Sequence, residues 1–168
     1  MSQLPKGPWT KTFFVKNVGT GSMLDLYAAS AVQGTRIQGF QQNFGAAQTW
    51  SVSADEDNNL AFMNANSNTY AYAPEPINGG NVVGSATLVR FKVVGDGGKY
   101  QIKPLDANDL AWSLANGNDC TPASTVFPSI EPVIQAAFTS RCCCKSPSAV
   151  TPPSSGFSKL SDKNVIHF

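Results

Sequence analysis

Asp25 is the residue whose setting first suggests chemistry, because it is an acid inside the otherwise apolar run "GSMLDLYAA". Side chains alternate between the two faces of a strand, so Leu24 and Leu26 are predicted to face the core and Asp25 to face outward. An ionised carboxylate accepts hydrogen bonds that are stronger than those between neutral groups. The same alternation is typical of any half-exposed strand. Two interpretations follow, a solvent-facing side chain or the anchor of a binding site.

The other ionisable residues do not form a catalytic set. Glycosidases need two carboxylates across the scissile bond, but the acids here are scattered: residues 55–57 share one polar turn, and Glu75 and Glu131 lie beside prolines. The single histidine, His167, is the penultimate residue, and no G-x-S-x-G motif is present. The sequence therefore predicts no catalytic residues and a protein that is not an enzyme.

The cysteines do not indicate a metal or a disulfide framework. Three of the four are consecutive, at 142–144, and only Cys120 is placed to pair with one of them at a distance. A zinc site would need paired ligands at spacings such as C-x2-C, and His167 lies well away in the sequence. We expect mostly free thiols, no bound metal and no cofactor.

Composition excludes two classes of partner. The chain of 168 residues carries 12 basic and 11 acidic side chains, and only 14% of its residues are charged. It therefore lacks the electrostatic footprint of a protein that binds nucleic acid or an anionic lipid surface. No apolar run reaches the roughly 20 residues of a membrane span, and the opening residues lack the features of a signal peptide. The expected location is the cytoplasm, or the exterior after secretion by a non-classical route.

Short segments rich in aromatic and β-branched residues, separated by Gly, Asn, Asp and Pro, predict an all-β fold. No sustained period of 3.6 residues interrupts them. The predicted strands are residues 12–18, 23–27, 36–41, 48–53, 60–64, 69–73, 81–84, 88–94, 99–103, 110–114, 125–127 and 134–140.

A weak internal repeat of roughly forty residues groups these strands by fours. Each unit opens on an aromatic and apolar strand and closes on a large aromatic: Trp50, Phe91 or Phe138. Three four-stranded repeats with pseudo-threefold symmetry predict a β-trefoil, whose shared core these aromatics would fill. An irregular β-sandwich is the alternative.

The predicted domain organisation is one trefoil followed by an extension. The trefoil domain covers residues 1–141, with repeats at about 12–53, 57–94 and 99–140, and residues 142–168 form a C-terminal extension rich in Ser and Pro. The last residues, "NVIHF", are apolar enough to dock as a strand on the barrel or on a second subunit.

Residues 14–50, "FVKNVGTGSMLDLYAASAVQGTRIQGFQQNFGAAQTW", resemble one repeat of the ricin B-type lectins, especially their small fungal members. The shared features are the opening "VKNVGTG", the Leu-Asp pair at 24–25, a Gly-Thr before the third strand, and the closing Q-x-W at 48–50. The second and third repeats match in outline only. The resemblance implies a lectin that binds galactose- or N-acetylgalactosamine-type glycans, on glycoproteins or glycolipids, with a role such as fungal defence.

The resemblance also implies a carbohydrate-binding site in the first repeat, at Asp25, Gln38, Phe40 and Gln48, and we add Asn43 as a candidate from its position. Ala47 departs from the family, which commonly has an Asn at that position, and the neighbouring Asn43 is the candidate to replace its amide. Sugar rings offer one apolar face and a rim of hydroxyls, so a site needs a flat platform with polar groups at its edge. Gln38 and Phe40 are two apart on one strand and would share a face, while Ile37 turns to the core.

The other two repeats lack the anchoring acid. Aligned on the Leu-Asp pair, the second has Ala71 at the acid's position and the third has Ala111 or Trp112. Tyr72 and Trp112 are expected to serve in packing. One site per chain follows, so that crosslinking of glycans would require a homodimer.

The second candidate function is that of a β-trefoil protease inhibitor that acts through a protruding loop. Residues 73–81 and 116–124 are the candidate loops. Prolines on both sides of Glu75 would stiffen the first of them and lower the entropy lost on binding.

Overall fold

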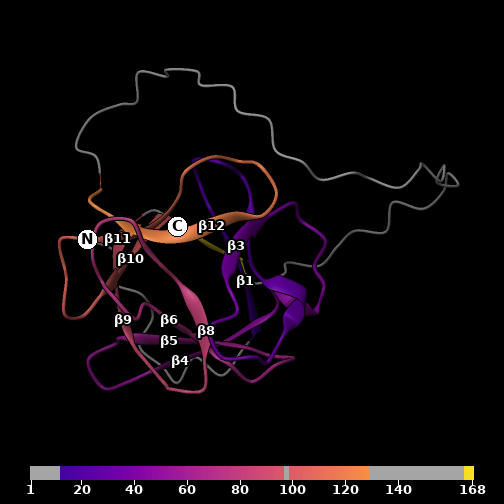
Figure 1. The fold of residues 1–168 in the computed structure, drawn as a ribbon. Helices are drawn as coiled ribbons and strands as arrows, with labels where there is room; N and C mark the ends of the chain where they lie inside the picture. The colour runs from indigo at the N-terminus through magenta and orange to yellow at the C-terminus, as the bar shows by residue number, and fades with distance from the viewer. Residues whose placement is uncertain (1–11, 97–98, 129–164) are drawn as a thin grey trace, which may run out of the picture. The chain divides into compact units, whose positions relative to one another are not determined.

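The computed structural model describes residues 12–96, 99–128 and 165–168, which form an all-β fold (Figure 1). The strands, in chain order, are β1 (Thr12–Lys16), β2 (Met23–Leu26), β3 (Ile37–Phe40), β4 (Trp50–Ala54), β5 (Leu60–Asn64), β6 (Tyr70–Tyr72), β7 (Gly80–Asn81), β8 (Val83–Ser85), β9 (Phe91–Asp96), β10 (Lys99–Pro104), β11 (Ala111–Leu114), β12 (Thr121–Val126) and β13 (Val165–His167). Two short 3-10 turns, η1 (Tyr27–Ala29) and η2 (Ala46–Gln48), follow β2 and precede β4. None of the helical segments in these residues has the length or apolar character to cross a membrane.

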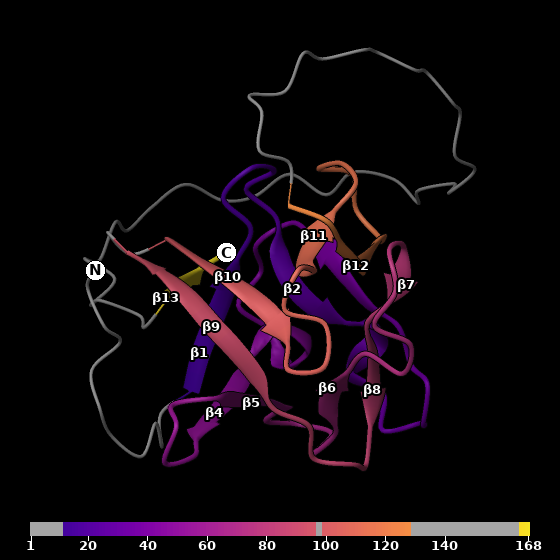
Figure 2. The ribbon, with the colours of Figure 1, turned by 90° about the vertical axis from the view of Figure 1, so that its left-hand side faces the viewer.

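Six of the strands close into a barrel. Pairing runs around the ring from β1 to β4, β5, β9, β10 and β13 and returns to β1. Figure 2 shows β13 between β1 and β10, where it completes the ring. Closure removes the sheet edges that an open six-stranded sheet would leave unpaired.

Three hairpins, built from β2–β3, β6–β8 and β11–β12, meet around the pseudo-threefold axis. Their backbones bond directly: the Ile37 amide donates to the Val82 carbonyl at 3.0 Å, and the Val82 amide to the Ala123 carbonyl at 2.8 Å. The third side of this contact is the pairing of β12 with β3, where Thr121 lies opposite Gly39. The β-trefoil prediction is confirmed.

The closing aromatics of two repeats fill the core, as predicted. Trp50 and Phe91 are both fully buried, whereas Phe138 lies outside the described residues. In the third repeat a buried aromatic comes from Phe168, which packs edge-on against Trp112 with their ring centroids 6.5 Å apart. Trp112 is thus a core residue, as expected.

The sixth barrel strand departs from the symmetry of the other five. β4 runs antiparallel to β1 and β9 antiparallel to β5, but β13 runs parallel to both β1 and β10. The end of the chain does dock on the barrel, because Ile166 and Phe168 are buried and the Phe168 amide donates to the Lys16 carbonyl at 2.7 Å. The strand expected at 134–140 and the cysteines at 142–144 lie outside the described residues.

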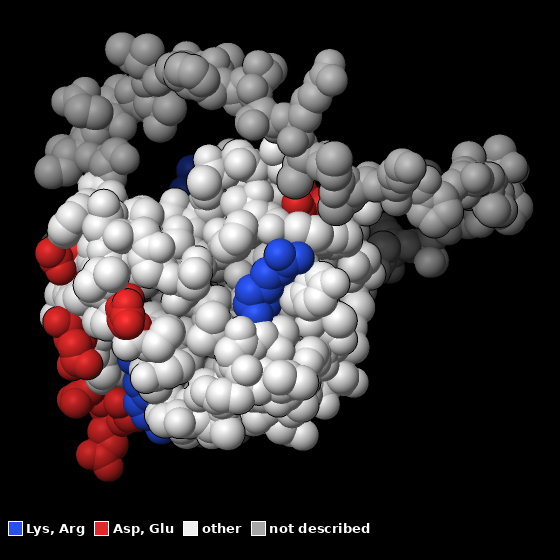
Figure 3. Space-filling model, viewed as in Figure 1, with Lys and Arg blue, Asp and Glu red and all other residues white. Residues whose placement is uncertain are grey.

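Charged side chains are sparse on the face seen in Figure 3. Acidic groups gather along its left edge, and wide areas of the described surface there carry no charge. This face therefore has no broad basic patch.

Candidate functional site

The β2–β3 hairpin of the first repeat brings Asp25 directly opposite Gln38. Leu24 and Leu26 on either side of the acid are fully buried in the core, as is Ile37 on the partner strand. The alternation that the sequence predicts is thus present, and it directs Asp25 and Gln38 to the other face of the hairpin.

Asp25 does not lie open on that face, and the expectation of a half-exposed acid is wrong. The residue is 4% exposed, because two amides cover the carboxylate: Gln38 donates to Oδ1 at 3.0 Å and Gln48 donates to Oδ2 at 3.3 Å. Burial raises the pKa of the Asp25 carboxyl above its ordinary value. The two amide hydrogen bonds offset part of that rise, and the nearby charge of Asp119 adds to it.

Gln48, the glutamine of the Q-x-W motif, is fully buried and both ends of its amide are engaged. Its Oε1 accepts from the backbone amides of Asn43 at 3.0 Å and Phe44 at 3.1 Å, and its Nε2 donates to the Gln41 carbonyl at 2.9 Å as well as to Asp25. Gln48 therefore fixes the loop after β3 and the carboxylate at the same time.

Gln38 has one end engaged and one end free. Its Nε2 is held by Asp25, but its Oε1 is buried and has no hydrogen-bond partner among the described residues. A buried acceptor without a donor is costly, and such groups usually have a functional explanation. The amide cannot simply turn over, because Oε1 would then face the carboxylate.

Phe40 and Asn43 form the more accessible part of the site. Phe40 is half-buried at the end of β3, on the same face as Gln38. Asn43 is exposed, and its Oδ1 accepts from the Gly45 amide at 2.8 Å, which leaves its amide nitrogen for a ligand. Ala47, where the family commonly has an amide, is partly exposed and offers no polar side chain.

The structure adds one residue that the sequence did not indicate, Asp119 of the third repeat. Its Oδ1 accepts from the Gln41 amide at 2.7 Å, and the adjacent Cys120 amide donates to the Gly39 carbonyl at 3.0 Å. The loop before β12 thus lies against the end of β3, and Asp119 acts electrostatically on Asp25. No pattern inside the first repeat could have revealed a neighbour that comes from about eighty positions further along.

In the second repeat the position of the acid is occupied by Tyr72. In the first hairpin Gly39 pairs with Leu24, the residue before Asp25. In the second hairpin the equivalent glycine, Gly84 of β8, pairs with Ala71, so the residue after Ala71 matches the acid. The alignment that put Ala71 at the acid's position is therefore wrong by one residue. Tyr72 is half-buried and cannot act as an anionic acceptor.

In the third repeat that position is occupied by Ser113. Leu114 pairs with Ala123, the residue that meets the other two hairpins at the axis, so the preceding Ser113 matches the acid. Neither Ala111 nor Trp112, the two residues expected there, is equivalent to it. The second and third hairpins both lack the carboxylate.

Comparisons with known proteins agree with this fold. The family model described as ricin-type beta-trefoil lectin domain-like matches residues 7–81. The agglutinin of Rhizoctonia solani is 31% identical, with a TM-score of 0.66 over 78% of this chain and 92% of that one. A search of curated protein sequences finds no significant match.

Two more distant structures share the fold. The Macrolepiota procera ricin B-like lectin, solved in complex with lactose, is 16% identical, with a TM-score of 0.63 over 74% of this chain and 91% of that one. The C-terminal half of the earthworm R-type lectin, solved in complex with GalNAc, is 14% identical, with a TM-score of 0.55 over 72% of this chain and 92% of that one. With a closed six-stranded barrel, three capping hairpins and a 31% identical agglutinin matched over nearly its whole length, the chain belongs to the family of ricin-type β-trefoil lectin-like proteins.

Proposed function

We propose that the protein binds carbohydrate without chemical conversion, through one site per chain formed by Asp25, Gln38, Phe40 and Asn43 in the first repeat. Gln48 is a positioning residue in this proposal, because it is fully buried and reaches a ligand only through Asp25 and the loop that it holds.

The observation that carries the proposal is a buried carboxylate with no cation beside it. Asp25 forms no ion pair within the described part of the chain, where Arg90 with Asp55 is the pair that forms. Burial of a charge with only neutral hydrogen bonds costs free energy, and a neutral amide could hold the two glutamines at lower cost. An acid retained in a buried position against such a cost is a candidate for function.

The unsatisfied oxygen of Gln38 supports a ligand rich in hydroxyl groups. A hydroxyl both donates and accepts, so it could donate to a remaining lone pair of Asp25, or to Gln38 Oε1 once a ligand displaces the groups that cover that oxygen, while it accepts from the free Asn43 amide nitrogen. Phe40 would supply the flat apolar surface for the C–H face of the ring. Sugars combine these two features.

Galactose or N-acetylgalactosamine is the proposed sugar class. Support comes from the complexes of two structural relatives, the Macrolepiota lectin with lactose and the earthworm lectin with GalNAc. A single site per chain is supported by Tyr72 and Ser113, which stand at the acid's position in the other two repeats. Agglutination would then require a second copy of the chain.

The candidate inhibitor loop at 73–81 gains no support from its conformation. It folds back on itself through turns, with the Ile77 amide bonded to the Glu75 carbonyl at 2.8 Å and the Gly80 amide to the Ile77 carbonyl at 2.9 Å. Thr125 also donates to the Ile77 carbonyl, at 2.7 Å. The extended backbone by which a peptide pairs with a protein strand is not offered here.

Calorimetric titration with galactose, GalNAc and lactose, preceded by a glycan array, tests the proposal. The native protein should bind one equivalent per chain, and Asp25→Asn should reduce affinity at least about 10-fold, as expected when a charged hydrogen-bonding partner is lost. Asp57→Asn, in an exposed turn, is the matched control and should bind normally. A blank array, or equal binding by Asp25→Asn, would refute the site, and inhibition of a protease panel by the same chain would favour the inhibitor.

A further inference from the structure

One face of the β2–β3 hairpin carries three successive cross-strand pairs. Residues two apart on a strand point to the same side, and the bond from the Tyr27 amide to the Arg36 carbonyl, 3.1 Å, extends the ladder beyond β2. The three pairs on this face, in order, are Met23 with Phe40, Asp25 with Gln38, and Tyr27 with Arg36. The proposed sugar site uses Phe40 of the first pair and both residues of the second, and leaves the third pair without a role.

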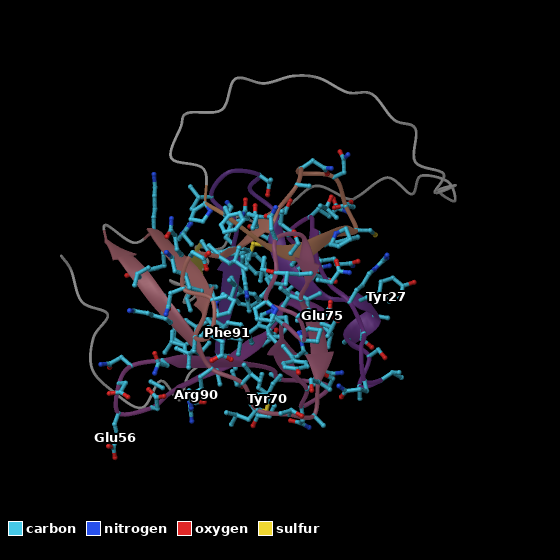
Figure 4. All side chains as sticks on the ribbon, turned by 60° about the vertical axis from the view of Figure 1, so that its left-hand side comes forward. Tyr27, Glu56, Tyr70, Glu75, Arg90 and Phe91 are labelled. Carbon is cyan, nitrogen blue, oxygen red and sulfur yellow. The ribbon has the colours of Figure 1, made fainter. Side chains whose placement is uncertain are left out.

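Tyr27 and Arg36 form an exposed stacked pair. The guanidinium carbon of Arg36 lies 4.5 Å from the centroid of the Tyr27 ring, which is the geometry of a cation–π contact. Tyr27 is 49% exposed and Arg36 is also exposed. Figure 4 shows Tyr27 pointing away from the barrel. The pair is therefore accessible to a ligand that already occupies the neighbouring site.

The guanidinium donors of Arg36 are not used by other described residues. Its guanidinium has five N–H donors, and none of them bonds to a described residue; none of the described carboxylates lies within ion-pair distance of it. The contact with the Tyr27 ring leaves the donor edges of the group without a hydrogen-bond partner among the described residues. Such a preorganised edge is suited to bidentate contact with a carboxylate or a sulfate.

The backbone around the pair is held in an unusual conformation. Ala28 and Ala29 both adopt left-handed dihedral angles, with φ of 54° and 48°, although neither is a glycine. The Ser30 amide closes this turn on the Tyr27 carbonyl at 3.1 Å, and Arg36 forms a bridge with Val83 of the second repeat. Left-handed backbone at alanine is costly and recurs at ligand sites, so the turn fixes Tyr27 at a cost in stability.

The two ends of this hairpin face carry opposite charges, Arg36 at one end and Asp119 at the other. Arg36 is two residues from Gln38, which is about 7 Å along the strand and suits a sugar joined to the one at Asp25. At the opposite end, the carboxylate of Asp119 accepts a hydrogen bond from the backbone amide of Gln41, the residue after Phe40. An anionic substituent is therefore attracted at the Arg36 end and repelled at the Phe40 end.

We propose that Tyr27 and Arg36 form a second subsite, which takes an anionic group, a sulfate ester or a carboxylate, on the sugar next to the one held at Asp25. This inference rests on the proposed carbohydrate site. The protein then recognises acidic glycans, with the neutral sugar and the anion bound by separate parts of one hairpin face.

Binding of lactose, its monosulfated forms and sialyllactose, measured by calorimetry at low and at physiological salt, tests the subsite. At least one anionic form should bind the native protein about fivefold more tightly than lactose, as an exposed charge pair provides, and the preference should shrink with salt. The sulfated and sialylated arms identify which anion is recognised. Arg36→Gln should bind the anionic and neutral forms alike, whereas Lys92→Gln, an exposed charge on β9, should keep the preference.

Two further variants separate the outcomes. Tyr27→Leu keeps the charge of Arg36 but removes its platform, and should lose most of the preference. Asp25→Asn should abolish binding of both neutral and anionic forms. Lactose binding with no anionic preference, a preference that survives Arg36→Gln, or anion binding that survives Asp25→Asn would each overturn the subsite. Absence of binding by every sugar would instead overturn the carbohydrate site itself.

Discussion

Gln38 donates from Nε2 to Oδ1 of Asp25 at 3.0 Å, while its own Oε1 is buried without a partner among the described residues. The carboxylate fixes the orientation of this amide, because a reversed amide would bring two oxygens together. The pair therefore presents two acceptors side by side, one charged and one neutral. A ligand with hydroxyl donors supplies what both of them lack, whereas a purely apolar ligand would leave the unsatisfied oxygen buried.

The first prediction is that Asp25→Asn folds at least as stably as the native protein at pH 7 while it loses glycan binding. The new amide can donate to Gln38 once that side chain turns over, and the Gln38 nitrogen then takes the place of the oxygen that already lacked a partner, so the number of unpaired buried groups does not rise. We expect a gain of about 1 kcal/mol in the free energy of unfolding, measured by urea denaturation. A loss of several kcal/mol would show that the charge of Asp25 is structural.

The second prediction concerns how stability depends on pH. Because burial raises the pKa of Asp25 in the folded state, the folded protein binds this proton more tightly than the unfolded chain. Its stability relative to Asp25→Asn should therefore fall as the pH rises from about 4, the ordinary value of an aspartate, through the raised folded pKa. Denaturation of both proteins between pH 3 and 8 measures this difference, and a difference that grows with pH would contradict the prediction.

The third prediction is that glycan binding weakens as the pH falls through the raised pKa of Asp25. Protonation removes the charged acceptor, so the loss should begin at a higher pH than for an ordinary aspartate. Asp119→Asn should move the midpoint to lower pH, because the charge of Asp119 contributes to the rise while an Asn oxygen can still accept from Gln41. Titration of lactose from pH 4 to 8 provides the midpoints, and equal midpoints would exclude the influence of Asp119.

The two glutamines should differ in a fourth test. Gln48→Ala removes four hydrogen bonds and leaves Asp25 Oδ2, the Gln41 carbonyl and two backbone amides of the loop after β3 without this partner, at an expected cost of about 3 kcal/mol. Gln38→Ala removes one hydrogen bond and one unsatisfied oxygen, and should cost about 1 kcal/mol or less while it weakens glycan binding. Urea denaturation of both variants tests the order, and equal costs would refute it.

Local pattern was sufficient to predict most of the fold and which side chains of β2 face the core. Alternation on β2 placed Leu24 and Leu26 in the core, and the closing aromatics Trp50 and Phe91 are buried as predicted. What the pattern could not predict is the burial of Asp25. Alternation distinguishes the two faces of a strand but does not show whether other side chains, here Gln48 from η2, cover the outer one.

The remaining differences come from contacts between distant segments. Both Ala71 and Tyr72 could take the acid's position in a degenerate repeat, and only the pairing of Ala71 with Gly84 decides between them. Asp119 reaches the site from another repeat. The apolar ending predicted that Val165–His167 could dock as a strand, but this strand lies far from β12 in sequence, so no local repeat showed that it completes the ring.

The last prediction concerns that strand. Phe168→Ala should lower the free energy of unfolding by about 3 kcal/mol, because its buried ring packs against Trp112 in the core and its loss leaves a cavity there. The backbone bond from the Phe168 amide to the Lys16 carbonyl remains, so the barrel should still close and the variant should still fold. Phe127→Ala, at an exposed aromatic, is the matched control and should change stability by less than about 0.5 kcal/mol. Urea denaturation followed by tryptophan fluorescence compares the two. Equal stability of the Phe168 variant and the native protein would show that the Phe168 ring does not contribute to the core.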